Sequence, residues 1–325
     1  MRTLVSSRSA RRTSACRFVG VAVVALLSGI VAVSAPTPLH ARLREARATP
    51  GTTTPVERAV ARGVVTLRTP GSAMIRVARS EFVFGSSPDD VLEALGRCAG
   101  EPFGHRCTER TFSNELPSLV ASIASFWLDR TEVTVEAYER CVAVGACPPR
   151  TLVAGERRLD SPELPVTLVS SYEAEAYCRF RGARLPSEAE FERAARGTTG
   201  RTYPWGDLYN SRLSNHGRFG MEAVDASDGF EELAPVGSFV SGRTPDGFLD
   251  LAGNAAEWTS DVYTERHGLP PEPGRSAGRV VKGGHFAKGS AWLRGAARAE
   301  LDPSDRSPFV GFRCARSAQK QPETP

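Results

Sequence analysis

The feature that most constrains this sequence is the long stretch from residue 198 to residue 316, in which glycine and proline recur every few residues. Helical and strand periodicities there are few and short, and the sequence contains no internal repeat. A chain that orders so much irregular backbone loses conformational entropy that regular elements and a core alone do not readily offset. We therefore expect additional ties between the loops, such as disulfides or bound cations.

The first 41 residues form a separate segment. They contain no Asp or Glu, and an apolar run over residues 18–33 follows five arginines, Arg2, Arg8, Arg11, Arg12 and Arg17. This pattern predicts an export signal, with candidate cleavage sites after Ala35 and Ala41. The apolar run is shorter than the roughly 20 residues of a typical span, yet an uncleaved membrane anchor stays open as the alternative. We expect a periplasmic or extracellular protein that meets the membrane only through this segment, if it is retained.

Charge excludes one class of partner. Removing residues 1–41 takes away five of the 41 basic residues and none of the 37 acidic ones, so the remainder is close to neutral. Nearly all of the positive charge is arginine, since the only lysines are Lys282, Lys288 and Lys320. Nucleic-acid binding needs a clustered basic face, and no nucleic-acid partner is expected.

Six of the seven cysteines lie beyond the leader. An even number in an exported chain favours disulfides over buried free thiols, which are the alternative. Proximity predicts two short loops, Cys98–Cys107 and Cys141–Cys147, and leaves Cys178 and Cys314.

The rest of the chain divides into a linker, a domain and a tail. Residues 42–70 contain Pro50, Pro55 and a threonine triplet without a sustained apolar period, which predicts a flexible linker. One domain is expected over residues 71–317, and a disordered tail over 318–325. Alternation in Met74–Ala78 and Glu81–Phe84 predicts an opening pair of strands, closed by a turn at Gly85–Pro88.

Three helices are predicted after these strands. The first lies in Val133–Val142, where Thr134 is a suitable N-cap. The apolar residues at helical spacing after it are Val135, Tyr138, Cys141 and Val142. A second helix over Ser170–Phe180 begins with Ser-x-x-Glu. A third opens at Pro186-Ser187-Glu188 and ends at Gly197.

Four motifs occur in a set order: R-L-P-S-E-A-E-F-E-R-A-A-R-G (Arg184–Gly197), Y-P-W-G (Tyr203–Gly206), G-N-A-A-E-W-T-S-D (Gly253–Asp261) and G-F-R-C (Gly311–Cys314). In these motifs the chain resembles the formylglycine-generating, or sulfatase-modifying-factor, family over residues 72–316. The resemblance implies an α+β, C-type-lectin-like fold with short twisted strands, few helices and long loops. It also implies that the positions of Cys178 and Cys314 pair.

The segment Val280–Arg298 departs from the family. In the family's oxidases, the residues after the paired glycines carry two cysteines that bind copper and oxidise a substrate cysteine to formylglycine. This segment has no cysteine, and Lys288 stands about where the first would be. Thiolate is the soft ligand that selects Cu(I), so copper is not expected and no catalytic residue is predicted.

The resemblance implies two structural calcium sites. Calcium takes six to eight oxygens from carboxylates, amides and carbonyls. The first set comprises Asn215, His216, Asp228 and Phe230; the second comprises Asp250, Gly253, Ala255 and Glu257. Turn-forming Asn and Asp beside glycines are the alternative interpretation of both sets.

Two substitutions change the expected groove. His285 occupies the position where the family's enzymes usually carry serine near the substrate cysteine, which makes it a candidate ligand contact. Ala256 replaces the tryptophan common in G-N-x-W-E-W. Three tryptophans, Trp205, Trp258 and Trp292, either line a pocket or pack in the core.

These observations predict an exported, calcium-stabilised, non-catalytic protein that binds a peptide, a glycan or an envelope protein in the family groove. An active formylglycine-generating oxidase, or another oxidoreductase acting on a protein substrate, is the first alternative. A structural envelope component without a small ligand is the second.

Overall fold

The computed structural model describes residues 73–152, 155–218, 225–267, 269–270 and 278–318. The predicted leader and linker, and nearly all of the predicted tail, lie outside these residues. Within them, no helix has the length and apolar character needed to cross a membrane.

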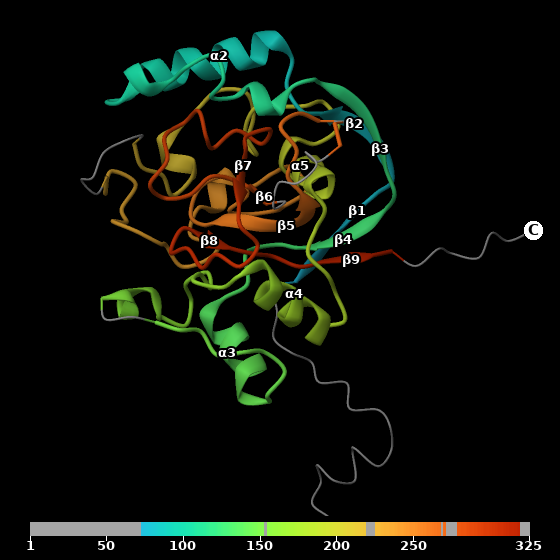
Figure 1. The fold of residues 1–325 in the computed structure, drawn as a ribbon, viewed down its shortest axis with the longest axis vertical. Helices are drawn as coiled ribbons and strands as arrows, with labels where there is room; N and C mark the ends of the chain where they lie inside the picture. The colour runs from blue at the N-terminus through green and yellow to red at the C-terminus, as the bar shows by residue number, and fades with distance from the viewer. Residues whose placement is uncertain (1–72, 153–154, 219–224, 268, 271–277, 319–325) are drawn as a thin grey trace, which may run out of the picture. The chain divides into compact units, whose positions relative to one another are not determined.

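The central sheet has four strands in the order β7-β6-β5-β8 (Figure 1). Its neighbours are antiparallel except for β5 and β8, which are parallel. The strands are β5 (Ala256–Val262), β6 (Arg279–Lys282), β7 (Arg298–Leu301) and β8 (Val310–Gly311). The G-N-A-A-E-W-T-S-D motif therefore leads into the longest strand of this sheet.

Two smaller sheets are built mainly from the N-terminal part of the domain. One has the order β1-β4-β9, from β1 (Met74–Val77), β4 (Phe126–Asp129) and β9 (Ala315–Ser317). The other pairs β2 (Ser80–Phe84) with β3 (Leu119–Ile123).

The predicted opening strands exist, but the prediction that they pair with each other is wrong. Val77 of β1 pairs with Phe126, and Phe82 of β2 pairs with Ala121. Val77 and Phe126 lie in one buried cluster with Leu128 and Phe191. Strand pairing here follows burial against residues that are distant in the chain, which local alternation does not report.

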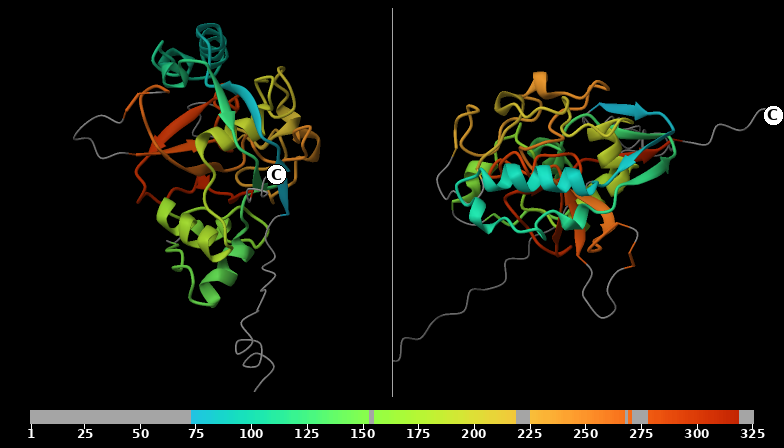
Figure 2. Two further views of the ribbon diagram at one scale, coloured as in Figure 1. Left: turned by 90° about the vertical axis from the view of Figure 1, so that its right-hand side faces the viewer. Right: turned by 90° about the horizontal axis from the view of Figure 1, so that it is seen from above.

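Four α-helices are described: α2 (Pro88–Ala99), α3 (Val135–Ala143), α4 (Ser171–Phe180) and α5 (Glu188–Arg196). The three predicted helices are confirmed, with Thr134, Ser170 and Ser187 as their N-caps. The start of helix α2 lies where the sequence predicted a turn, at Gly85–Pro88. Ser87 caps it and Pro88 opens it, so the Ser-Pro-Asp-Asp sequence is a helix start that was taken for a turn. Figures 1 and 2 show α2 at one end of the central sheet and α3 and α4 at the other.

All three disulfide pairings are present. The Cα atoms are 6.0 Å apart in Cys98–Cys107, 5.3 Å in Cys141–Cys147 and 5.6 Å in Cys178–Cys314. The last of these joins α4 to the residue before β9, across 136 positions of sequence. It lies in the main hydrophobic core beside the stacked rings of Tyr138 and Tyr177.

Candidate functional site

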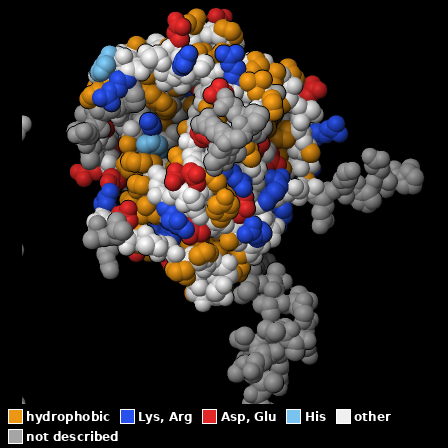
Figure 3. All heavy atoms as spheres, viewed as in Figure 1, with side chains coloured by type: hydrophobic (Ala, Val, Ile, Leu, Met, Phe, Trp, Pro, Cys, Tyr) orange, Lys and Arg blue, Asp and Glu red, His pale blue; other side chains and the backbone are white. Residues whose placement is uncertain are grey.

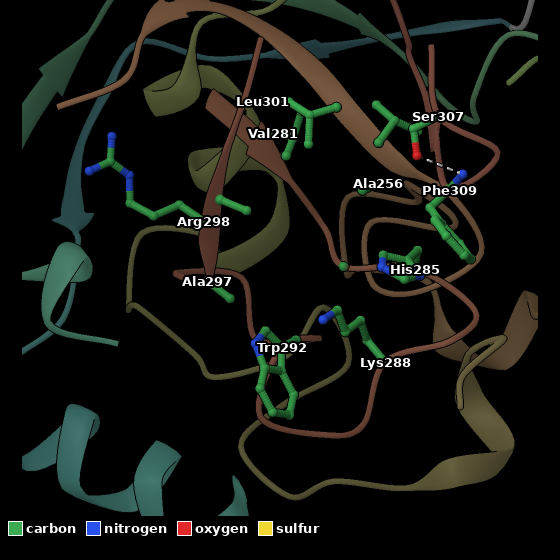
Figure 4. Close-up of a pocket in the computed structure, with 13 residues that line it drawn as sticks. Ala256, Val281, His285, Lys288, Trp292, Ala297, Arg298, Leu301, Ser307 and Phe309 are labelled. Carbon is green, nitrogen blue, oxygen red and sulfur yellow. Dashed lines mark hydrogen bonds between the residues drawn. The ribbon is translucent and has the colours of Figure 1, made fainter. Parts of the chain in front are cut away.

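A cavity of about 250 Å³ opens at the end of the central sheet where β6 runs into the loop that leads to β7 (Figure 4). Its walls come from β5, β6, β7, the loop between β6 and β7, and the segment before β8. The lining residues are Ala256, Val281, Gly284, His285, Lys288, Trp292, Ala297, Arg298, Ala299, Leu301, Ser307, Phe309 and Val310.

The paired glycines after β6 shape this cavity. Gly283 and Gly284 have φ values of 90° and 65°, in the left-handed region that favours glycine. A Cβ on Gly284 would lie 2.6 Å from the carbonyl oxygen of Trp292. This close approach folds the loop back on itself, so His285 and Lys288 reach the cavity that Trp292 also lines.

His285 is neutral at pH 7. Burial, with the charge of Lys288 as the second cause, lowers the pKa of His285 to about 3. Its Nδ1 accepts a hydrogen bond from the backbone N–H of Ala287 at 3.3 Å, and its ring lies 4.5 Å from that of Phe309. With Nδ1 as the acceptor, the proton of the neutral ring is on Nε2.

Lys288 is a basic side chain in the cavity wall. Its Nζ lies 5.1 Å from the centre of the Trp292 ring, and burial lowers the pKa of Lys288. In Figure 4 the side chain reaches into the space between His285 and Trp292. Arg298 also lines the cavity; in Figure 4 its guanidinium points away from Lys288, and it pairs with Glu188 at 2.8 Å.

The three tryptophans singled out in the sequence separate. Trp292 lines the cavity, whereas Trp258 is fully buried and donates from Nε1 to the carbonyl of Val169. Trp205 stacks on Tyr203 with ring centres 5.2 Å apart, next to a different, open hollow. Core packing accounts for Trp258, and only Trp292 joins the two substituted positions, Ala256 and His285, in the cavity.

All six cysteines of the described residues are engaged in disulfides. The cavity therefore has no thiol among its described walls. In the same part of the chain, no group of three or more His, Cys, Asp or Glu side chains is placed to hold a metal ion.

The first predicted calcium set is brought together around Asp228. Its two carboxylate oxygens accept from the backbone N–H of His216 at 2.7 Å and of Phe230 at 3.0 Å. The amide nitrogen of Asn215 is hydrogen-bonded, but its Oδ1 is buried without a partner among the described residues. A buried oxygen in that state suits a cation ligand, so the residues present fit the ion.

The second predicted set fits less completely. Both oxygens of Glu257 accept from Arg313 at 2.7 Å, and Asp250 Oδ2 accepts from the backbone N–H of Gly237 at 2.6 Å. Asp250 and Gly253 adopt left-handed φ values of 56° and 82°. Glu257 is thus engaged in an ion pair with Arg313. Asp250 is left as the residue of this set whose side-chain oxygen could bind a cation.

Glu132 belongs to the same buried group and was missed in the sequence. Its Oε1 accepts from the side-chain amide of Asn254 at 3.0 Å, while Oε2 has no donor in the described part of the chain. Burial, then the charges of Asp250 and Glu257, raise the pKa of Glu132 well above its ordinary value. The side chains of Glu132 and Asp250 interact, so a proton held by Glu132 can be shared with Asp250. Only the Thr-Glu-Val context before α3 marks this residue in the sequence.

On the face drawn in Figure 3, acidic and basic side chains are interspersed, and hydrophobic side chains lie beside basic and histidine side chains.

The chain is similar in sequence to formylglycine-generating enzymes and to a hercynine oxygenase. The chain is 39% identical over 169 residues to the inactive Cα-formylglycine-generating enzyme 2 of Mus musculus, covering 50% of this chain and 52% of that protein. It is 38% identical over 175 residues to the formylglycine-generating enzyme of Streptomyces coelicolor, covering 48% and 54%. It is 33% identical over 181 residues to the hercynine oxygenase of Mycolicibacterium thermoresistibile, covering 50% and 38%. The matches thus span about half or less of the length of these relatives.

Among solved structures, PvdO from Pseudomonas aeruginosa superposes with a TM-score of 0.59 at 23% identity, over 76% of this chain and 95% of that one. At this identity the likeness shows the fold alone, which agrees with the α+β arrangement of few helices, short strands and long loops. The model of the sulfatase-modifying factor enzyme 1-like domain matches residues 66–318, and the chain therefore belongs to this family.

Proposed function

We propose that this protein is an exported, non-oxidising member of the family that binds an apolar side chain of a peptide or protein partner in the cavity beside Lys288. The observation that carries the proposal is the set of side chains that line the cavity. Lys288 stands near the position of the family's first copper-binding cysteine, and every described cysteine is in a disulfide. Relatives of both kinds, oxidases and an inactive enzyme, are consistent with a family that tolerates loss of the chemistry.

The walls favour an apolar side chain over a sugar. Most of the lining residues present alkyl or aromatic groups, including Val281, Leu301 and Phe309. A sugar would bury hydroxyl groups against these walls without hydrogen-bond partners, which costs free energy. A leucine or phenylalanine side chain loses nothing by the same transfer and gains about 1.5–3 kcal/mol on full burial.

Filling the cavity tests this proposal. Ala256→Trp places a large ring in the cavity wall, and we expect it to weaken binding of Phe- or Leu-bearing peptides by roughly tenfold to a hundredfold in fluorescence anisotropy. Val120→Trp is the matched control, since Val120 is 76% exposed and outside the cavity. Equal binding by the wild type and Ala256→Trp would refute the site, and binding of oligosaccharides that Ala256→Trp abolishes would transfer it to a glycan.

Calcium forms the second part of the proposal. A cation that binds only the folded state adds RT ln(1 + [L]/Kd), about 2.7 kcal/mol when free calcium is 100 times Kd. Asn215→Leu removes the buried Oδ1, so it should reduce the difference between melts with calcium and with chelator. Coincident melts of the wild type in both conditions would count against both predicted sites.

A further inference from the structure

Lysine is rare in this chain, and one of its three lysines is at the cavity. Lys282 is fully buried and donates to Glu192 at 2.8 Å and to the carbonyl of Ala296 at 3.1 Å. Its charge is thus matched by a carboxylate. Lys320 lies outside the described residues. Lys288 differs from Lys282 because it is only partly buried and borders a cavity large enough for a small molecule.

The surroundings of Lys288 favour a nucleophilic amine. Desolvation disfavours the ammonium form, and burial lowers the pKa of Lys288, so the neutral amine is more populated than on an exposed lysine. The Trp292 face, 5.1 Å away, opposes this through cation–π attraction. A carboxylate, that of Glu101, lies close to the backbone of the next residue, Gly289.

His285 completes the geometry. It lines the same cavity, and its neutral ring carries the proton on Nε2, since Nδ1 accepts from Ala287. His285 and Lys288 line the same cavity, and Figure 4 shows the two side chains near each other there. An N–H at this place can donate a hydrogen bond to an oxygen atom held next to the amine.

We propose that Lys288 captures a small apolar aldehyde or ketone in this cavity as a Schiff base. This inference rests on the proposed function in so far as the cavity is the binding site. A lysine desolvated in an apolar pocket is a recognised nucleophile toward carbonyl groups. The aromatic or branched alkyl body of the ligand would contact Val281, Leu301 and Phe309, with its carbonyl directed at Lys288.

The step needs no oxidant or reductant. The lone pair of the neutral Nζ forms a bond to the carbonyl carbon, and the π pair of the C=O bond moves to oxygen, where the His285 Nε2–H can donate. The nitrogen loses both of its protons, the oxygen leaves as water, and a C=N bond forms. Amine and carbonyl thus give imine and water.

Reductive trapping tests the capture. The full-length protein is incubated with benzaldehyde and sodium cyanoborohydride, and labelling of the three lysines is compared by peptide mass spectrometry. We expect Lys288 to be labelled more than Lys320, because burial lowers the pKa of Lys288 and so raises the share of the neutral amine. Lys288→Arg fixes the background, and Ala256→Trp should remove the excess labelling. A second arm replaces benzaldehyde with a peptide that carries an aldehyde side chain, which distinguishes a free carbonyl compound from a protein-borne one.

Labelling of Lys288 no greater than that of Lys320 in both arms would overturn the capture. Benzyl alcohol, which has no carbonyl, separates the two proposals. If it stabilises the wild type but not Ala256→Trp while Lys288 stays unlabelled, the cavity binds apolar groups and only the capture fails. If it has no effect and neither carbonyl probe labels Lys288, the binding proposal fails as well.

Discussion

Several charged side chains of this domain are buried. Arg313 is fully buried and pairs with both oxygens of Glu257, and it also donates to the backbone carbonyls of Asp129, Arg130 and Leu249. The charge of Arg313 also acts on the carboxylates of Glu132 and Asp250. One guanidinium therefore faces three acidic groups away from water.

Arg313→Met should be strongly destabilising. It removes the only cation in contact with Glu257 in the described residues and leaves that carboxylate buried and unpaired, for which a cost of about 3–5 kcal/mol is typical. Arg179→Met is the matched control, because its pair with Glu175 is exposed and such pairs contribute about 0–1 kcal/mol. Urea denaturation of both variants checks this. Equal losses would show that the buried pair carries no special weight.

Glu132 makes stability depend on pH. Its folded-state pKa is raised, mainly by burial, above the ordinary value of 4.5. The folded state then holds a proton that the unfolded state releases, so this contribution is complete below pH 4.5 and is lost as pH rises from there. Glu132→Gln cannot titrate and offers an N–H to Asp250.

Measured in chelator, the wild type should lose stability relative to Glu132→Gln as the pH is raised above 4.5. Urea denaturation across this range gives the difference, with Glu136→Gln, at an exposed position of α3, as the control. A difference that does not change with pH would show that Glu132 has its ordinary pKa in the folded state.

At the scale of elements, the disulfides close loops of very different length. Cys178–Cys314 ties α4 to the residue before β9, whereas Cys141–Cys147 closes a short loop at the end of α3. In the chain-entropy model the stabilisation grows with the length of the closed loop.

Replacing Cys178 and Cys314 with serine should cost roughly 5 kcal/mol, and the same change at Cys141 and Cys147 about 2 kcal/mol. Denaturant midpoints of the two double variants test the order, after peptide mapping without reductant has verified the pairing. A larger loss for the short loop would contradict the loop-entropy account.

Across the whole molecule, the sequence predicted what short-range chemistry decides. The caps at Thr134, Ser170 and Ser187 act on backbone groups two or three residues away, so the sequence alone predicts them. The start of α2 at Ser87 carried the same kind of signal and was missed, because a Gly-Ser-Ser-Pro run is also typical of turns.

What depends on distant partners could not be predicted in this way. The pairing of β1 with β4 links residues about 50 positions apart, and the hydrogen bond between Glu132 and Asn254 spans 122 positions. Resemblance to the family made Glu257 a candidate ligand, and nothing local in the sequence shows that Arg313, 56 positions later, pairs with its carboxylate. The cavity also depends on long-range packing, since it joins Ala256 to Lys288 and Phe309.

The central claim is that this domain binds without oxidising cysteine, and mass spectrometry of a cysteine-containing sulfatase peptide tests it most directly. The purified full-length protein is supplied with copper and reductant, beside the Streptomyces coelicolor enzyme as a positive control. We predict no aldehyde above the level without protein, because the described residues offer no free thiolate to hold Cu(I). Aldehyde above that level would contradict the claim and favour an active oxidase.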